Sequence, residues 1–122
     1  MKIIVTGAAG FIGMQSCLKL LKSNFTVLGI DNLNNYYDKN LKLNRIKILK
    51  KFKKFYFKKI DISHKGIFNI FKKFKPDFVF HLAAQAGVRH SISHPQDYTS
   101  SNLVGFANIL ECSKLNKIKH LI

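Results

Sequence analysis

The segment Val5-Thr6-Gly7-Ala8-Ala9-Gly10-Phe11-Ile12-Gly13 places three glycines at G-x-x-G-x-x-G spacing, directly behind the apolar run 2–6. That run is short, rich in β-branched residues and without alternation, which is typical of a buried parallel strand. Apolar residues then recur at helical spacing and predict a helix over 11–23, namely Met14, Cys17, Leu18 and Leu21. A glycine-rich turn from a strand into a helix predicts a binding site for a dinucleotide pyrophosphate.

Each glycine of this turn has a predicted role. Gly7 permits the tight turn, Gly10 lets phosphates approach the backbone, and Gly13 lets the helix lie close to the strand. Asp31 closes a second apolar run, 25–30, and can accept hydrogen bonds from the adenosine ribose hydroxyls, which favours NAD over NADP. The alternative is a glycine-rich turn in an unrelated α/β protein. The ordered succession of strand, helix, second strand and acid favours dinucleotide binding.

Strands and helices alternate along the whole chain. We expect strands over 2–6, 26–30, 55–60, 78–82 and from 118 to the end, helices over 11–23 and 39–51, and a loop over 83–96. Ser63 is a plausible N-cap for a helix bearing Ile67, Ile70, Phe71 and Phe74. A long helix carries Leu103, Phe106, Ala107 and Leu110 at the same apolar spacing. The pattern predicts an α/β, Rossmann-type doubly wound parallel sheet of strand order 3-2-1-4-5, incomplete because the chain ends in strand five.

Length and composition limit what the chain can contain. Its 122 residues allow one domain, a nucleotide-binding domain over 1–122, and are too few for a substrate domain as well. Thr6 and Gly7 interrupt the N-terminal apolar run, so we expect no signal peptide, no membrane partner and a cytoplasmic protein. Cys17 and Cys112 fall on predicted helices and are expected to be buried thiols, and the histidines show no metal-ligand spacing, so no metal is predicted.

The formal net charge of +15 admits two interpretations. A basic chain can bind nucleic acid, and the densest basic segment, 47–59, interleaves lysines with Phe52, Phe55, Tyr56 and Phe57. The other interpretation is a compositional bias toward lysine, spread over solvated faces. All but two of the basic residues are lysines, so the arginine forks that recognise phosphates and bases are nearly absent. We therefore expect no nucleic-acid partner and assign these aromatic residues to the core.

The chain resembles the N-terminal part of the extended short-chain dehydrogenases/reductases, and among them the NAD-dependent nucleotide-sugar epimerases. The resemblance is carried by five segments: 6–13, Gly29 to Asp38 with its Asn-Asn-Tyr-Tyr-Asp loop, Asp61-Ile62, His81 to Arg89 with its Ala-Gln-Ala-Gly-Val-Arg loop, and 101–105. The first segment is shared across the extended family. The two loops are more specific to the UDP-glucuronate 4-epimerases.

The resemblance implies NAD as cofactor and assigns roles to particular residues. Asp31 and Asn32 would bind the adenosine ribose, Asp61 and Ile62 would flank the adenine, and Asn102 would steady the loop after strand four. The complete set of cofactor-binding residues that it implies is Gly7, Gly10, Phe11, Ile12, Gly13, Asp31, Asn32, Asp61, Ile62, Leu82, Ala83, Ala84, Gln85 and Asn102. Arg89 would lie near the pocket for a UDP-sugar, where an arginine suits a sugar carboxylate.

Several of these residues have structural alternatives. Asp61 could cap a helix before Ser63, and Arg89 could pair with an acidic residue on the surface. Tyr36 and Tyr37 could be loop packing residues. His81, at a strand end, is expected to be structural rather than a proton shuttle.

The residues that carry out the family's chemistry are not in these 122 residues. The resemblance implies transient oxidation at the sugar C4 by NAD, with a tyrosine as base and a lysine four residues later that lowers the tyrosine pKa. The four tyrosines are instead followed at that spacing by Asn40, Leu41, Ile60 and Asn102. We predict no catalytic residue here and no epimerase activity from this polypeptide alone. It would need a complementary C-terminal polypeptide, or would self-associate through an unpaired edge strand. The alternative functions are a non-catalytic NAD-binding module and a basic nucleic-acid-binding protein.

Overall fold

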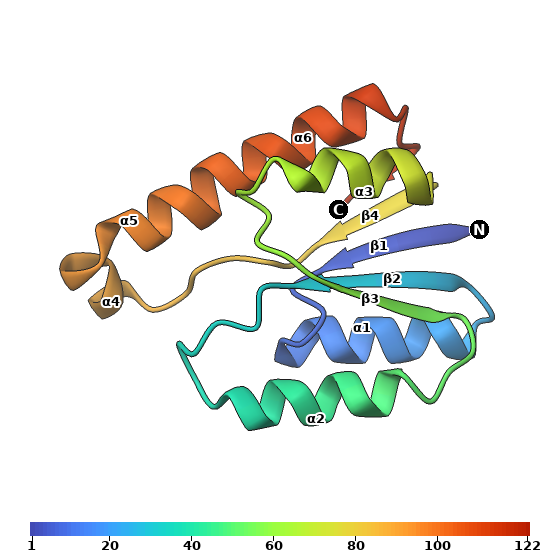
Figure 1. Cartoon of the computed structure of the whole chain (residues 1–122), viewed down its shortest axis with the longest axis horizontal. Helices are drawn as coiled ribbons and strands as arrows, with labels where there is room; N and C mark the ends of the chain where they lie inside the picture. The colour runs from blue at the N-terminus through green and yellow to red at the C-terminus, as the bar shows by residue number, and fades with distance from the viewer.

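The computed structural model describes residues 1–122 and consists of a five-stranded parallel sheet with helices on both faces (Figure 1). The strands lie in the order β3-β2-β1-β4-β5, as the sequence predicted. Their bounds are β1 Lys2–Thr6, β2 Thr26–Asp31, β3 Phe55–Lys59, β4 Phe78–His81 and β5 His120–Leu121. The central strand β1 pairs with β2 and β4, so that Ile3 lies between Val27 and Phe78. This order reverses direction beside β1, which is where such sheets bind their ligands.

The helices cover the sheet in two layers (Figure 1). Their bounds are α1 Phe11–Lys22, α2 Lys39–Leu49, α3 Gly66–Phe74, α4 Val88–Ser93, α5 Pro95–Tyr98 and α6 Phe106–Leu115, with a π-helical segment η1 at Thr99–Gly105 before α6. Helices α1 and α2 lie on one face, and α3 and α6 lie on the other. None of them has the length and apolar character that crossing a membrane requires.

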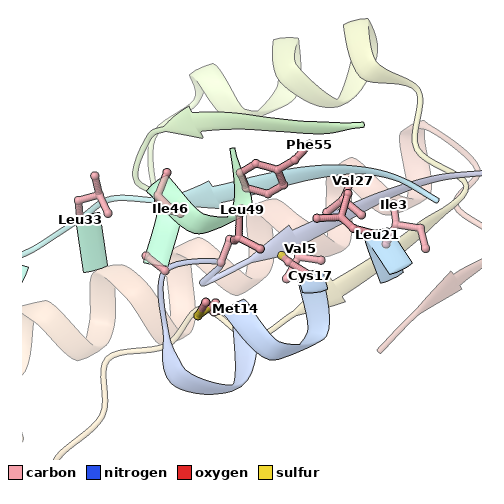
Figure 2. Packing of buried hydrophobic residues seen from close by; sticks show 12 residues of the cluster. Ile3, Val5, Met14, Cys17, Leu21, Val27, Leu33, Ile46, Leu49 and Phe55 are labelled. Atoms are coloured by element: carbon pink, nitrogen blue, oxygen red, sulfur yellow. The ribbon is translucent and has the colours of Figure 1, made fainter. Parts of the chain in front are cut away.

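Alternate residues of β1 supply the cores of the two layers, because successive strand side chains point to opposite faces. Ile3 and Val5 pack with α1 and α2, in a cluster that includes Cys17 and Leu49 (Figure 2). Ile4 packs on the other face in a second cluster. Its other buried members are Leu28, Ile30, Ile62, Ile67, Phe71, Val79, Ile109 and Cys112. Both cysteines are free and buried, as predicted.

The start of α3 and the loop after β4 differ from the sequence prediction. Ser63 does not cap α3, which begins at Gly66, because its hydroxyl and amide both donate to the Asp61 carboxylate (2.7 and 2.9 Å). The segment 83–96, expected to be a loop, contains α4 and begins α5. Both helices are shorter than two turns, too short to produce a recognisable apolar period.

The apolar stripe predicted on the long helix exists but faces outward. Leu103 is 67% exposed, and Phe106 and Leu110 are 41% and 46% exposed. The face that packs against α3 is made instead by Ile109 and Cys112, both fully buried. Helical periodicity correctly identified an apolar stripe along η1 and α6. It cannot tell which of two apolar faces of a helix packs against the rest of the protein.

The aromatic residues of β3 are only partly in the core, contrary to the prediction. Phe55 is buried and Phe57 packs partly buried on the same cluster, whereas Tyr56 is 55% exposed. Tyr56 lies beside Leu28 and so points to the α3 face. Because β3 is the edge strand, the helices of that face do not cover it.

Candidate functional site

A cavity of about 270 Å³ lies at the carboxyl edge of the sheet. Its lining residues come from the carboxyl end of β2 and from the segments that directly follow β1, β2, β3 and β4, together with Lys42 of α2 and Ser101 of η1. The lining consists of Gly7, Gly10, Ile30, Asp31, Asn32, Asn34, Tyr36, Tyr37, Lys42, Ile60, Asp61, Ile62, Leu82, Ala83, Ala84, Gln85, Ala86 and Ser101. One apolar wall with a few convergent carboxylates and amides is typical of a small-molecule site.

The glycine turn forms the floor of this cavity in a conformation that side chains would prevent. Gly7 has φ +69°, and a Cβ there would lie 2.7 Å from the carbonyl oxygen of Leu82. A Cβ on Gly13 would overlap the carbonyl oxygen of Gly7. The backbone of the turn therefore packs directly against the segment after β4 and the start of α1.

The N-terminus of α1 points its free amides toward the turn. The first bond of the helix runs from the Met14 amide to the Gly10 carbonyl (3.0 Å), so the amides of Phe11, Ile12 and Gly13 have no partner within the helix. No acidic residue occupies its first turn. The side chains of Phe11 and Ile12 are exposed and do not line the cavity. Such an end favours an anion.

Asp31 ties the turn to the loop after β2. Its Oδ2 accepts a hydrogen bond from the Ala9 amide (3.0 Å), and its Oδ1 accepts one from the Leu33 amide (2.8 Å). The carboxylate is buried yet lines the cavity. Each oxygen has a second lone pair, so the group can still accept hydrogen bonds from a ligand hydroxyl.

Asp61 joins the loops after β2 and β3. Its Oδ2 accepts from Asn32 Nδ2 (2.8 Å), and its Oδ1 accepts from the amide and hydroxyl of Ser63. Burial opposes ionisation, but the hydrogen bonds from Asn32 and Ser63 outweigh it and lower the pKa of Asp61. Asp61 thus closes a turn rather than capping α3, and its carboxylate stays ionised beside the cavity.

Thr6 positions the segment that follows β4. Its fully buried Oγ1 accepts hydrogen bonds from the amides of Leu82 and Ala83 (3.1 Å each) and lies 2.8 Å from Nδ1 of His81. With both lone pairs engaged, the hydroxyl donates its proton to Nδ1, so His81 carries its own proton on Nε2 and is neutral. Burial also lowers the pKa of His81. The ring stacks on Phe106 at 5.4 Å, so His81 has a structural role, as expected.

Asn102 connects the loop after β4 to η1 by two hydrogen bonds. Its Oδ1 accepts from the Gln85 amide (2.8 Å) and its Nδ2 donates to the Gln85 carbonyl (3.0 Å), so the side chain pairs with this backbone as a strand would. Gln85 is buried in the cavity wall. Asn102 does not itself line the cavity, and π-helical turns such as η1 often occur at functional sites.

Lys42 is a cavity residue that sequence reasoning did not identify. Its ammonium is buried and donates to the carbonyl and side-chain oxygens of Asn34 (3.1 and 2.6 Å), above the ring of Tyr37. Burial lowers the pKa of Lys42, and the charge of Asp31 partly opposes this effect. Nothing in the sequence separates this lysine from the others, because the lysine bias conceals it.

Ten of the residues predicted to bind the cofactor line the cavity: Gly7, Gly10, Asp31, Asn32, Asp61, Ile62, Leu82, Ala83, Ala84 and Gln85. Phe11, Ile12, Gly13 and Asn102 do not line it, although Gly13 packs against Gly7 and Asn102 bonds to Gln85 of the lining. Arg89 is exposed on α4 and does not line the cavity, and its side chain makes neither a hydrogen bond nor an ion pair. The structure therefore does not pair Arg89 with a surface acid, and its place beside a UDP-sugar stays a prediction.

The strand order, the glycine turn and the cavity at the carboxyl edge define a Rossmann-type α/β protein. Comparison with known proteins identifies the family within this class of fold. The model of the GDP-mannose 4,6-dehydratase family matches residues 4–121, and the chain belongs to that family.

Relatives and solved structures agree with this assignment. The chain is 46% identical to protein CapI of Staphylococcus aureus, over all of this chain and 36% of that protein. It is 45% identical to the UDP-glucuronate 4-epimerase of Thermodesulfobacterium geofontis, over 98% of this chain and 37% of that enzyme. Among solved structures, UDP-glucuronic acid 4-epimerase of Bacillus cereus, in complex with UDP-glucuronic acid and NAD, aligns with TM-score 0.90 and 37% identity over 99% of this chain and 38% of that one. The chain thus spans a little over a third of the length of the proteins it matches.

Proposed function

We propose that this chain is the NAD-binding part of an enzyme similar to UDP-glucuronate 4-epimerase. The observation that carries the proposal is the cavity itself, which brings the glycine turn, Asp31 and Asp61 to one edge of the sheet. The similar epimerase of known structure was crystallised with NAD and UDP-glucuronic acid. NAD, when bound, would accept and return the hydride at C4 of the sugar.

The residues of the cavity fit the parts of NAD. The amides at the start of α1 suit the pyrophosphate, because they are unpaired and lie at the positive end of the helix dipole. Asp31 and Asn32 offer acceptors for the adenosine ribose, while Asp61 and Ile62 offer a carboxylate and an apolar surface for the adenine. The segment from Leu82 to Gln85 forms the opposite wall.

A polypeptide of these 122 residues should bind NADH without epimerising a sugar, because no tyrosine is followed four residues later by a lysine. Fluorescence titration with NADH tests binding, and incubation with NAD and UDP-glucuronate tests turnover. We expect Asp31→Ala to weaken NADH binding at least roughly tenfold, because a hydrogen bond to a charged group contributes about 1.5–3 kcal/mol. Glu111→Gln, on the outer surface of α6, is the matched control. Equal affinity of the two variants for NADH would reject the proposed site. Turnover of UDP-glucuronate by the unmodified chain would reject the expectation that these residues bind the cofactor without carrying out the epimerisation.

A further inference from the structure

Tyr36 joins the two loops on either side of the cavity. It belongs to the loop between β2 and α2, and its hydroxyl oxygen lies so close to Gly87, after β4, that a Cβ on Gly87 would overlap it. Its ring lies 5.0 Å from the ring of His90, tilted by 60°. Tyr36 therefore bridges the opening between the β2 side and the β4 side of the cavity.

The Gly87 end of this bridge is fixed. Gly87 has φ +96°, and its carbonyl accepts hydrogen bonds from the Tyr98 hydroxyl and from the amide of His90 (2.9 Å). A side chain at this position would strain the backbone and also displace the Tyr36 ring. The contact surface that receives Tyr36 is thus held by α4 and α5.

The Tyr36 end is held by packing alone, in contrast to its neighbour Tyr37 in the same loop. Tyr36 is 43% exposed, and its hydroxyl makes no hydrogen bond. The Tyr37 hydroxyl accepts from Arg45 (3.4 Å), and the ammonium of Lys42 lies 4.5 Å from the centre of the Tyr37 ring. Tyr36 can therefore leave Gly87 without breaking a hydrogen bond, while Tyr37 keeps the loop in place.

Tyr36 also stands between two cavities. It lines the main cavity and a second one of about 300 Å³, whose walls are polar. The other residues that line both cavities are Asn32, Asn34, Asp61, Gln85 and Ser101. The glycine turn lines only the main cavity. Tyr36 is the shared residue whose ring reaches across to Gly87 and His90, so movement of this ring would widen the connection between the polar cavity and the proposed cofactor site.

We propose that Tyr36 is the gate of the dinucleotide site: its ring closes over the bound cofactor and swings away from Gly87 to admit or release it. This inference rests on the proposed function, because its ligand is NAD. A gate raises the barrier to association and dissociation equally and leaves the dissociation constant unchanged. A side chain that merely contacts the ligand changes mainly the dissociation rate.

Stopped-flow fluorescence with NADH and the full 122-residue chain separates these cases. Tyr36→Ala should raise the association and dissociation rates together, by roughly fivefold or more, and leave Kd within about twofold. Tyr36→Phe should behave like the unmodified chain, because the hydroxyl has no hydrogen bond. Tyr56→Ala is the matched control, because this tyrosine is 55% exposed on β3 and lines neither cavity, and it should leave both rates unchanged.

Two results would overturn the gate. Unchanged rates in Tyr36→Ala would show that the ring does not obstruct passage, and an increase in the dissociation rate alone would make Tyr36 an ordinary ligand contact. In both cases the unmodified chain still binds NADH, so the proposed function stands. Failure of the unmodified chain to bind NADH would reject the proposed function, and the gate with it.

Discussion

The Thr6 hydroxyl determines the position of the main-chain segment that walls the cavity. Thr6→Val keeps the shape of the side chain but leaves the part-buried amide of Ala83 without an acceptor and the Leu82 amide with only the main-chain carbonyl of Thr6 (3.3 Å). We expect a loss of about 1–3 kcal/mol in the free energy of unfolding, the usual cost of such an unpaired group. Urea denaturation measures it. Thr6→Ser keeps the hydroxyl and should cost only about 0.8 kcal/mol for its missing methyl group. Equal stability of the two variants would contradict this account.

His81 makes stability depend on pH in a predictable direction. Its pKa in the folded chain lies below the ordinary value, so the unfolded chain binds a proton that the folded chain resists. The contribution of His81 is therefore complete above its ordinary pKa of about 6.5, and it decreases as the pH falls from there toward the folded pKa. Urea denaturation at several pH values should show a shallower decrease in this window for His81→Phe, which retains an aromatic ring against Phe106. An unchanged pH profile would show that His81 is not the titrating group.

The glycine turn and the place of Asp31 at the end of β2 could be predicted from the sequence, because a turn and a strand end are indicated by the residues next to them. Lys42 and Tyr36 could not, since each acts through a contact with a residue in another loop. Ser63 was misinterpreted although its partner is local. Its hydroxyl could cap a following helix or donate to the Asp61 carboxylate two residues earlier, and local sequence does not decide between these two bonds; in the structure the second one forms.

Helices and strands with a strong local signal were predicted within a residue or two at most ends. The first helix starts at Phe11 in both the prediction and the structure, because the glycine turn fixes that end. Helices α4 and α5 were missed because contacts of their side chains hold them in place, and their sequences carry no apolar period. Two such contacts are the bond from Tyr98 to Gly87 and the 2.8 Å pair between His90 and Asp97.

Segment η1 holds the loop after β4 through the side chain of Asn102, and a single substitution can remove this contact. Asn102→Ala removes both hydrogen bonds to the backbone of Gln85. If the proposed cofactor site is correct, NADH affinity should fall by roughly five- to tenfold, since a typical hydrogen bond contributes about 0.5–1.5 kcal/mol. Hydrogen exchange at the Gln85 amide should also become faster.

The control for this prediction is another asparagine that bonds to a carbonyl far from the cavity. Asn116 donates to the Cys112 carbonyl (2.8 Å) at the end of α6. Asn116→Ala should leave NADH affinity unchanged, even where it lowers stability by a similar amount. A matching loss of affinity in both variants would mean that destabilisation, not the position of the loop, weakens binding.

The fold as a whole is well packed between its layers but leaves an apolar surface open on η1 and α6. The cores on the two faces of the sheet contain the largest fully buried side chains, among them Phe71, Ile4 and Leu49. The η1–α6 stripe of Leu103, Phe106 and Leu110, in contrast, is exposed. Exposed apolar stripes of this kind mark surfaces that bind another protein surface. The same stripe was predicted from sequence as a core face, because periodicity reports that a face is apolar and not what covers it.

This open stripe leads us to expect that a polypeptide of these 122 residues self-associates at micromolar concentration. The double variant Leu103→Lys/Leu110→Lys should shift the sedimentation coefficient toward the monomer, because association would bury added ammonium groups at a high desolvation cost. Ile48→Lys is the matched control, since Ile48 is 43% exposed on α2, on the opposite face of the sheet. A monomeric unmodified chain, or an equal shift in the control, would show that the stripe does not drive association. Unchanged urea midpoints in the variants would establish that the charges act between chains and not on the fold.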